Sequence, residues 1–252
     1  MTLTNKAFIN VEWPVPKVLA FSTTRHSPEQ SNLSQTRVNS LRSSQRAPKL
    51  SSSVNVHVNI KPESPFDDFN LGLHVGDEAQ HVLNNRDQLN KYLPAGTNIQ
   101  WLEQVHSNFV QVVNTHSKHA VIADASYTRE KNVALAIMTA DCLPIFITNK
   151  KGDEIAAIHG GWRPLVSGVI GNTISKFLSH NNDLYAWLGP CIGEKKFEIG
   201  ENVYQAFIAL SVEFKQAFKL IANTQNKYLA DLQLIATMQL KQLGVTNIFI
   251  EK

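Results

Sequence analysis

Strand-like runs rich in valine and isoleucine are interspersed with helix-like segments along this chain of 252 residues. Strands are expected at 100–113, 133–138, 143–148, 155–158 and 247–250. Helices are expected at 77–93, 164–178, 201–222 and 227–243, the first with Asp77 as its N-cap and Gln80 at the capping-box position. Because strands and helices do not alternate regularly and no glycine-rich phosphate loop is present, the pattern disfavours a Rossmann fold.

Composition is typical of a globular enzyme, with 43% hydrophobic and 18% charged residues. No apolar run approaches the roughly 20 residues needed to span a bilayer, and the N-terminus lacks the pattern of a signal peptide. We therefore expect a cytoplasmic protein without membrane contact. The net charge of +3 comes without a basic block, so nucleic acid is not expected as a partner.

Residues 27–65 are rich in serine, asparagine, glutamine and proline and poor in aromatic side chains. Such a segment buries too little apolar surface to offset the entropy of ordering it. We expect a flexible insertion in which only residues 51–60, with alternating valines, resemble a strand.

Three side chains with affinity for soft or borderline metals end strand-like runs: His106, Cys142 and His159. Two imidazoles and one thiolate match the preferences of zinc and copper, and three protein ligands leave a coordination position open for chemistry. Each residue also has an ordinary interpretation, since most strand-end histidines and apolar-run cysteines bind no metal. The two glycines after His159 make it the strongest of the three because they allow a tight turn. A disulfide between Cys142 and Cys191, the two cysteines of the chain, is not expected in a reducing compartment.

Several phrases occur together and in order: WLEQVHS (101–107), ALAIMTADCLPIF (134–146), AAIHGGWRPLVSGVI (156–170) and WLGPCIG (187–193). With these phrases the chain resembles the YfiH-type laccase-domain family, whose members are described as multicopper polyphenol oxidases or purine nucleoside phosphorylases. Shorter matches extend the resemblance over roughly residues 13 to 250.

The resemblance implies a mixed α/β (α+β) fold in one domain covering residues 1–252, with mixed sheets packed face to face and helices outside. It also implies that His106, Cys142 and His159 are the metal ligands, with zinc as the expected ion and copper as the alternative. Among these, Cys142 and His159 are expected to be catalytic, together with Asp141.

Other polar residues in the matched phrases are candidates for binding substrate. Arg25 and Arg163 can bind phosphate in a bidentate manner, although surface ion pairs are the commoner use of arginine. Asn70 and Asp141 can hold substrate hydroxyls or orient a ligand imidazole. His74 is either an exposed loop residue or a substrate contact. Asp124 either orients a ligand imidazole or forms a turn.

The function implied by the resemblance is metal-dependent phosphorolysis of purine nucleosides, adenosine and inosine and also methylthioadenosine, with associated adenosine deamination. Purine nucleoside and phosphate are then the partners, and the sequence does not fix the oligomeric state. One alternative is a copper-dependent polyphenol oxidase, although the nine histidines include no His-x-His pair. Further alternatives are a Cys/His hydrolase that edits peptidoglycan precursors and a metal-binding protein without catalysis.

Three departures from the family pattern bear on these expectations. The 27–65 insertion stands where relatives are expected to have a shorter connection. Pro164 stands where the family favours glycine, and it restricts the backbone of Arg163. Relatives are also expected to continue beyond the position of Lys252 through a further strand, which would leave a sheet edge uncovered here.

Overall fold

The computed structural model describes residues 3, 5–15, 17–28, 66 and 69–251. They fall into two compact units, one within Met1–Asn10 and Phe21–Leu93 and the other within Val11–Ala20 and Pro94–Lys252. Of the expected 27–65 insertion, only Ser27 and Pro28 are among the described residues. The strand expected at 51–60 lies outside them. One domain covering the whole chain stays a prediction.

The first unit contains a β-hairpin-like pair and one helix. Strand β1 (Phe8–Asn10) is antiparallel to β2 (Phe21–Thr23). The ring of Phe8 packs against those of Phe21 and Tyr92, with centroids 5.1 and 4.9 Å apart. These aromatic contacts join the strand pair to the residues that follow helix α2 (Ala79–Asn90).

Helix α2 is shorter than the predicted 77–93, and the prediction of its N-cap is wrong. The N-cap is Glu78, which makes no side-chain cap hydrogen bond. Asp77 instead accepts hydrogen bonds from the Asn70 amide at 2.9 Å and pairs with His81 at 3.1 Å. The Gln80 amide donates to Asn84 at 3.0 Å rather than returning to the N-terminus. Other side chains near in sequence therefore bind the groups that the predicted cap would have used.

The second unit is built on a six-stranded mixed sheet with strand order β15-β11-β9-β10-β7-β5. Its strands are β5 (Val110–Val112), β7 (Ala125–Thr128), β9 (Leu143–Asn149), β10 (Ile155–Gly160), β11 (Leu184–Leu188) and β15 (Asn247–Ile250). Strand β9 is antiparallel to β10 and β11, whereas β5 and β15 lie parallel to their neighbours. Ile145 and Ile147 of β9 are fully buried in the core, and between them Phe146 stacks on Trp187 at 5.1 Å. Both faces of the central strand therefore pack apolar side chains.

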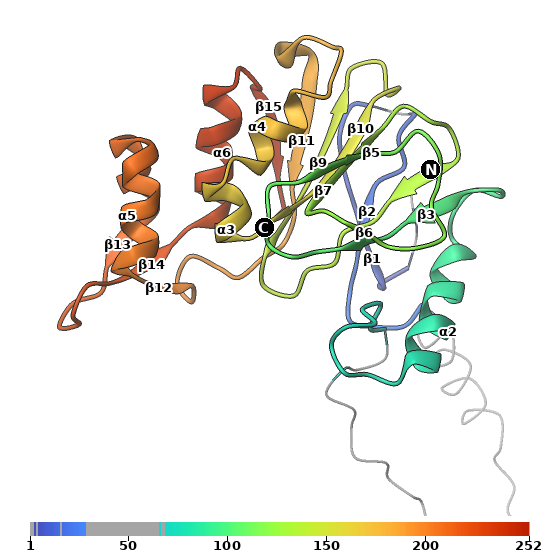
Figure 1. Cartoon of the computed structure of the whole chain (residues 1–252), viewed down its shortest axis with the longest axis horizontal. Coiled ribbons are helices and arrows are strands. Elements are labelled where there is room, and N and C mark those ends of the chain that lie inside the picture. The colour runs from blue at the N-terminus through green and yellow to red at the C-terminus, as the bar shows by residue number, and fades with distance from the viewer. Residues whose placement is uncertain (1–2, 4, 16, 29–65, 67–68, 252) are drawn as a thin grey trace, which may run out of the picture. The chain divides into compact units, whose positions relative to one another are not determined.

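Three helices, α3 (Trp162–Val166), α4 (Val169–Ile174) and α6 (Leu232–Gln242), lie side by side next to the sheet (Figure 1). Their buried residues, such as Leu165, Ile170 and Ile235, form one hydrophobic core with the sheet. A single helix was predicted over 164–178. It is instead interrupted at Gly168, whose φ of 84° is left-handed and available to glycine at little cost.

The segment after β11 differs most from the prediction. Beyond the loop at 189–197 it contains β12 (Glu198–Gly200), α5 (Glu201–Leu210), the 3₁₀ helix η2 (Val212–Ala217), β13 (Phe218–Leu220) and β14 (Lys227–Ala230). The predicted helix over 201–222 ends at Ser211, whose extended backbone and side chain cap η2. The predicted helix over 227–243 begins later, because the Asp231 side chain accepts a hydrogen bond from the Leu234 amide at 2.9 Å and so caps α6.

Two short parallel pairs and a 3₁₀ turn complete the second unit. Strand β3 (Asn98–Gln100) pairs with β8 (Val133–Leu135), and β4 (Leu102–Glu103) pairs with β6 (Val121–Ile122); the turn is η1 (Asn181–Asp183). The run predicted as one strand over 100–113 is thus divided among β3, β4 and β5. The mixed α/β class is confirmed.

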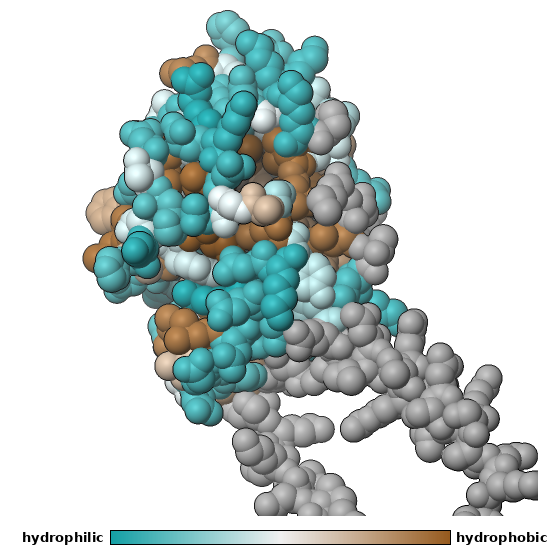
Figure 2. Space-filling view, turned by 90° about the vertical axis from the view of Figure 1, so that its right-hand side faces the viewer, coloured by the Kyte–Doolittle hydropathy of each residue, from teal (hydrophilic) through white to brown (hydrophobic). Residues whose placement is uncertain are grey.

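On the face shown in Figure 2, apolar side chains form patches that are separated by larger hydrophilic areas. The exposed large apolar residues of the second unit are likewise distributed over several elements, from Val105 to Ile250. Within the described residues, no helix has both the length and the apolar character required for crossing a membrane.

Candidate metal centre

The ends of two central strands bring two of the expected ligands together. Strands β9 and β10 are antiparallel, and Gly160 near the end of β10 pairs with Leu143 at the start of β9. His159 precedes Gly160 and Cys142 precedes Leu143, so both residues lie at the same end of this strand pair. His106 reaches the same end of the two strands from the turn that follows β4.

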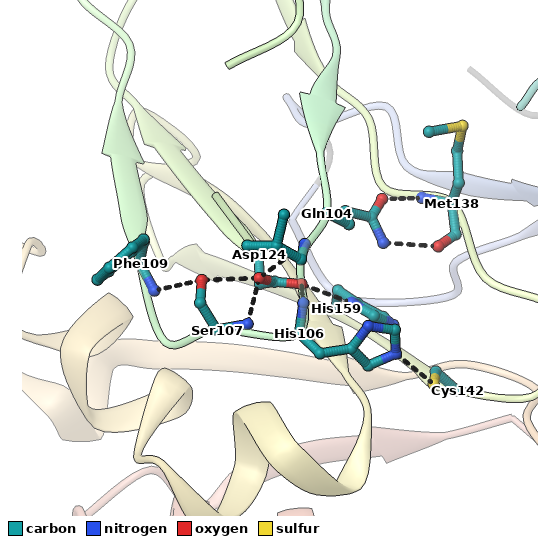
Figure 3. Close-up of polar contacts among 9 residues, drawn as sticks. Gln104, His106, Ser107, Phe109, Asp124, Met138, Cys142 and His159 are labelled. Atoms are coloured by element: carbon teal, nitrogen blue, oxygen red, sulfur yellow. Dashed lines mark hydrogen bonds and ion pairs between the residues drawn. The ribbon is translucent and has the colours of Figure 1, made fainter. Parts of the chain in front are cut away.

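The ligand atoms of His106, Cys142 and His159 all lie within 4.8 Å of one another, and this is the one such group of metal-binding side chains in the described residues. The Cys142 Sγ and His106 Nε2 atoms are 4.0 Å apart, and the two imidazole rings are 4.7 Å apart between centroids (Figure 3). Tetrahedral zinc with these ligands would require separations of about 3.3–3.8 Å. Small rotations of the side chains would suffice, so the donor set fits such an ion.

Asp124, at the end of the loop before β7, organises two of the three ligands. It is fully buried. Its Oδ1 atom lies 2.8 Å from His159 Nδ1 and accepts a hydrogen bond from the His106 backbone amide at 2.9 Å. Its Oδ2 atom accepts from the amide and hydroxyl of Ser107. A single carboxylate therefore holds one ligand by its ring and the other by its backbone (Figure 3).

These contacts determine the protonation states of the pair. Burial alone would raise the pKa of Asp124, but hydrogen bonds from His159 and Ser107 outweigh burial and place its pKa below the usual value. Burial lowers the pKa of His159 by more than the hydrogen bond to Asp124 raises it. A neutral His159 that donates from Nδ1 to Asp124 presents the Nε2 lone pair to a metal, which is the arrangement found in carboxylate–histidine–metal triads.

His106 occupies an unusual backbone conformation. Its φ angle is 59°, in the left-handed region that a residue with a side chain seldom adopts. The amides of Val105, His106 and Ser107 all donate to the Asp124 carboxylate, which stabilises this turn. Such a conformation is retained where the surrounding structure enforces it, and it is common at functional sites.

Gln104 connects the loop of His106 to the loop of Cys142. Its side-chain amide donates to the Met138 carbonyl at 2.8 Å, and its side-chain oxygen accepts from the Met138 amide at 2.7 Å. The side chain thus pairs with the backbone much as a neighbouring strand would. We refer to this pair of hydrogen bonds as the Gln104 clamp.

Gly161 allows the three ligands to approach one another. A Cβ atom at this position would lie 3.0 Å from Cys142 Sγ and 3.3 Å from the His106 ring. Gly160 is still more restricted, since its Cβ would meet the Leu143 carbonyl oxygen at 2.7 Å. Glycine stands at both positions after His159 because a side chain would be too close to its neighbours, and not because the backbone has an unusual φ angle.

Cys142 is held as a thiol when no metal is present. Burial, followed by the negative charges of Asp141 and Asp124, raises the pKa of this thiol. A raised pKa makes a cysteine a poor nucleophile by itself. Metal binding would deprotonate the thiol, so the electrostatics favour a metal ligand over a nucleophile.

Two further predicted residues lie close in sequence to the ligands. Asp141 is exposed, and its backbone carbonyl accepts a hydrogen bond from Ile192 at 2.9 Å. Arg163 is also exposed, and its guanidinium lies 4.4 Å from the ring centroid of Trp162. Stacking on an aromatic face leaves the in-plane N–H donors of a guanidinium able to bind an oxyanion. The roles of both residues stay predictions.

Arg25, Asn70 and His74 belong to the first unit. Arg25 and His74 are exposed. The Asn70 side chain bonds both backbone groups of Gly72 and the Asp77 carboxylate, so it shapes its own loop. Their expected contacts with substrate remain predictions.

Sequence reasoning left the role of Asp124 open and gave none to Gln104. Asp124 could be interpreted equally well as a turn-former, and Gln104 was noted only as part of a motif. An acidic residue between two alanines in an apolar stretch is one signal for Asp124, because a buried carboxylate requires several donors. No sequence signal specifies the Gln104 clamp, since its partner is a backbone group.

Comparison with known proteins places this site in a family. Residues 59–252 match the model of the family described as multi-copper polyphenol oxidoreductase laccase. The chain is 40% identical over 185 residues to the purine nucleoside phosphorylase YfiH of Escherichia coli (strain K12), covering 73% of this chain and 75% of the relative. It is 40% identical over 186 residues to a purine nucleoside phosphorylase of Haemophilus influenzae, covering 74% and 76% of the two chains. A crystal structure of a Neisseria meningitidis protein superposes with a TM-score of 0.78 at 31% identity, over 98% of this chain and 88% of the other.

The fold and the match to the family model thus define a protein of the laccase-domain class. More specifically, the chain belongs to the YfiH-type purine nucleoside phosphorylase family.

Proposed function

We propose that this protein is a zinc-dependent purine nucleoside phosphorylase that cleaves adenosine and inosine. The observation that carries the proposal is the convergence of His106, Cys142 and His159, with ligand atoms within 4.8 Å and His159 oriented by a buried carboxylate. The relatives named as purine nucleoside phosphorylases supply the substrate class. Methylthioadenosine, which has the same purine and ribose linkage, is a further expected substrate.

In phosphorolysis, a phosphate oxygen attacks C1′ of the ribose while the glycosidic bond to the purine breaks. A zinc ion bound by the three side chains would supply a Lewis acid with an open position for an oxyanion or a water molecule. Arg163 and Arg25 would neutralise phosphate charge. Asn70 and His74 are proposed to contact the nucleoside, and Asp141, beside Cys142, to accept or hold a substrate proton.

The same centre supports a hydrolytic reaction. In deamination, water attacks C6 of adenosine and ammonia leaves, so that inosine forms without phosphate. Zinc-bound water has a pKa of about 7, which makes this step accessible at neutral pH. We propose adenosine deamination as an associated activity of the protein.

The ligand set also bears on a second function, oxidation of phenols with copper. Two histidines and one cysteine are the in-plane ligands of blue-copper centres, and the family description names a laccase. Among the described residues, however, a single group of metal-binding side chains is present. We therefore rank this function below phosphorolysis.

A Cys/His hydrolase and a non-catalytic metal protein are the remaining alternatives. The raised pKa of the Cys142 thiol opposes the first, since a metal-free nucleophile requires a thiolate. A metal protein without catalysis would bind zinc stoichiometrically and convert no nucleoside.

Product analysis separates these functions. Metal-quantified protein is incubated with adenosine or inosine, with and without phosphate, and products are resolved by chromatography; a copper-loaded sample is given a phenol. Phosphate-dependent release of free base and ribose 1-phosphate supports the proposal, and inosine formed from adenosine without phosphate supports the deaminase activity. We expect Cys142→Ser to lower turnover at least about 100-fold, in line with loss of a metal ligand. Cys191→Ser is the matched control. Turnover unchanged by Cys142→Ser in metal-quantified protein would rule out the proposed centre.

A further inference from the structure

Cys191 lies in the loop that follows β11, and none of the roles proposed above involves it. Two further hydrogen bonds join the residues after β11 to the start of β9 and to the loop before it. Leu188 pairs with Ile145, and the next residue, Gly189, donates its amide to the Pro144 carbonyl at 2.9 Å. Further along, the Ile192 amide donates to the Asp141 carbonyl, also at 2.9 Å. The two donor residues and the two acceptor residues are thus separated by the same number of positions along the sequence.

Cys191 and Cys142 lie between these two hydrogen bonds, each one residue from the bond between Ile192 and Asp141, so their backbones are neighbours. Disulfides join residues whose Cα atoms are about 4.4–6.8 Å apart. Hydrogen bonds on both sides of the two cysteines hold the segments close enough for such an approach.

Both cysteines are free thiols, and both are partly accessible. Burial, followed by the charges of Asp231 and Cys142, raises the pKa of Cys191 to about 11. The raised pKa also makes oxidation slow, because the thiolate is the reacting form.

We propose that Cys142 and Cys191 form an oxidisable dithiol, a modification site that closes to a cross-strand disulfide. The structure, in which both cysteines are free thiols, represents the reduced form of this pair. Its natural oxidant is of the hydroperoxide class, and its reductant is a dithiol or another thiol.

The chemistry balances with hydrogen peroxide. The thiolate of one cysteine attacks a peroxide oxygen, so that an S–O bond forms, the O–O bond breaks and water leaves. The second thiolate then attacks the resulting sulfenic sulfur, forming the S–S bond as hydroxide leaves and is protonated to water. Two thiols and one peroxide become one disulfide and two waters.

Oxidation would also remove a metal ligand, since a disulfide sulfur carries no negative charge for a metal. This second part rests on the proposed metal centre, whereas the disulfide itself does not. We expect the oxidised protein to bind zinc at least about 100-fold more weakly than the reduced protein, because only the two histidines remain. Bound zinc should in turn slow oxidation by occupying the Cys142 sulfur.

The test treats full-length protein, metal-free and zinc-loaded, with hydrogen peroxide. Intact mass, peptide mapping without reductant and thiol counting are measured before and after dithiothreitol. We expect the metal-free protein to lose two hydrogens, to yield a peptide linking Cys142 to Cys191 and to regain both thiols on reduction. The Cys191→Ser protein should form no such link and should still bind zinc like the reduced wild type.

Two results would overturn the proposal in distinguishable ways. The first applies to metal-free protein in which both thiols can be alkylated. If peroxide then yields only sulfinic or sulfonic acids at either cysteine, or only intermolecular links, the pair does not close. An intramolecular disulfide in a protein that retains zinc with undiminished affinity would refute the coupling to the metal. Because neither readout uses nucleoside turnover, failure of the proposed enzymatic activity is scored separately.

Discussion

Asp124 is the residue on which the geometry of the centre depends most. Its carboxylate accepts from the His159 ring and from the backbone of the His106 turn, so its two oxygens serve both ligands. Asparagine at this position would retain one oxygen but would direct an N–H₂ group at backbone donors. Both ligands would then lose orientation, although neither is itself altered.

We predict that Asp124→Asn weakens zinc binding about 10- to 100-fold, the usual cost of losing a partner of a ligating histidine. The measurement is competition with a chromophoric chelator, together with thermal unfolding of the metal-free protein to confirm that it folds. Asp183→Asn, which alters an exposed aspartate of η1, is the matched control. Zinc affinity equal to that of the wild type would show that Asp124 has no part in organising the ligands.

At the scale of elements, strands that are continuous apolar runs are predicted from the sequence more accurately than short strands that depend on their pairing partners. Strands β9, β10 and β15 lie where they were predicted, because continuous apolar runs bounded by turns have few other interpretations. Strands β13 and β14 were predicted as helix. Their state is determined by pairing with each other and, for β14, with β12, and such tertiary contacts override local propensity.

The site shows the same division between local and tertiary information. Its three candidate ligands stand in short motifs, each within one segment of chain, and the structure brings them together. The contribution of Asp124 could not be predicted in this way, because it depends on the fold bringing the residues before β7 to the turn after β4. The Gln104 clamp depends likewise on a backbone partner in another loop.

The clamp allows a prediction about how two loops are held together. Gln104→Met preserves the approximate length of the side chain but removes both hydrogen bonds to Met138. We expect a loss of about 1–3 kcal/mol in stability and about 10-fold weaker zinc binding, since the His106 and Cys142 loops would move independently. Chelator competition gives the affinity, and the absorption spectrum of the cobalt-substituted protein reports altered thiolate and imidazole geometry.

Gln111→Met is the control for this substitution, because the Gln111 amide donates only to the neighbouring Val112 carbonyl among the hydrogen bonds described. Gln104→Glu adds a finer comparison, since it retains the acceptor for the Met138 amide and loses the donor. A cobalt spectrum and zinc affinity unchanged in Gln104→Met would mean that the clamp does not position the ligands.

At the scale of the second unit, another buried carboxylate links parts of the fold that are distant in sequence. Glu154 is 3% exposed. It accepts hydrogen bonds from the Tyr127 hydroxyl at 2.6 Å, the Leu178 amide at 2.7 Å and the Asn149 side chain at 3.1 Å, and from Ser179. The carboxylate therefore ties strands β7, β9 and β10 to the loop that follows α4. None of these partners belongs to the metal centre, so stability and metal binding can be tested separately.

The pKa of Glu154 gives this link a pH dependence. Burial alone would raise the pKa, but the hydrogen bonds from Ser179 and Tyr127 dominate and hold it below the usual value of 4.5. A folded pKa below the unfolded one contributes stability that is present above about pH 4.5 and is lost as the pH falls through the folded pKa.

We predict that Glu154→Gln lowers the free energy of unfolding by about 2–4 kcal/mol near neutral pH. We also predict that the variant loses less stability than the wild type as the pH falls below about 4.5. Urea unfolding of metal-free protein measures both effects, with the exposed Glu130→Gln as control. Parallel pH profiles for wild type and Glu154→Gln would show that this carboxylate is not a source of acid sensitivity, even if the variant is less stable at every pH.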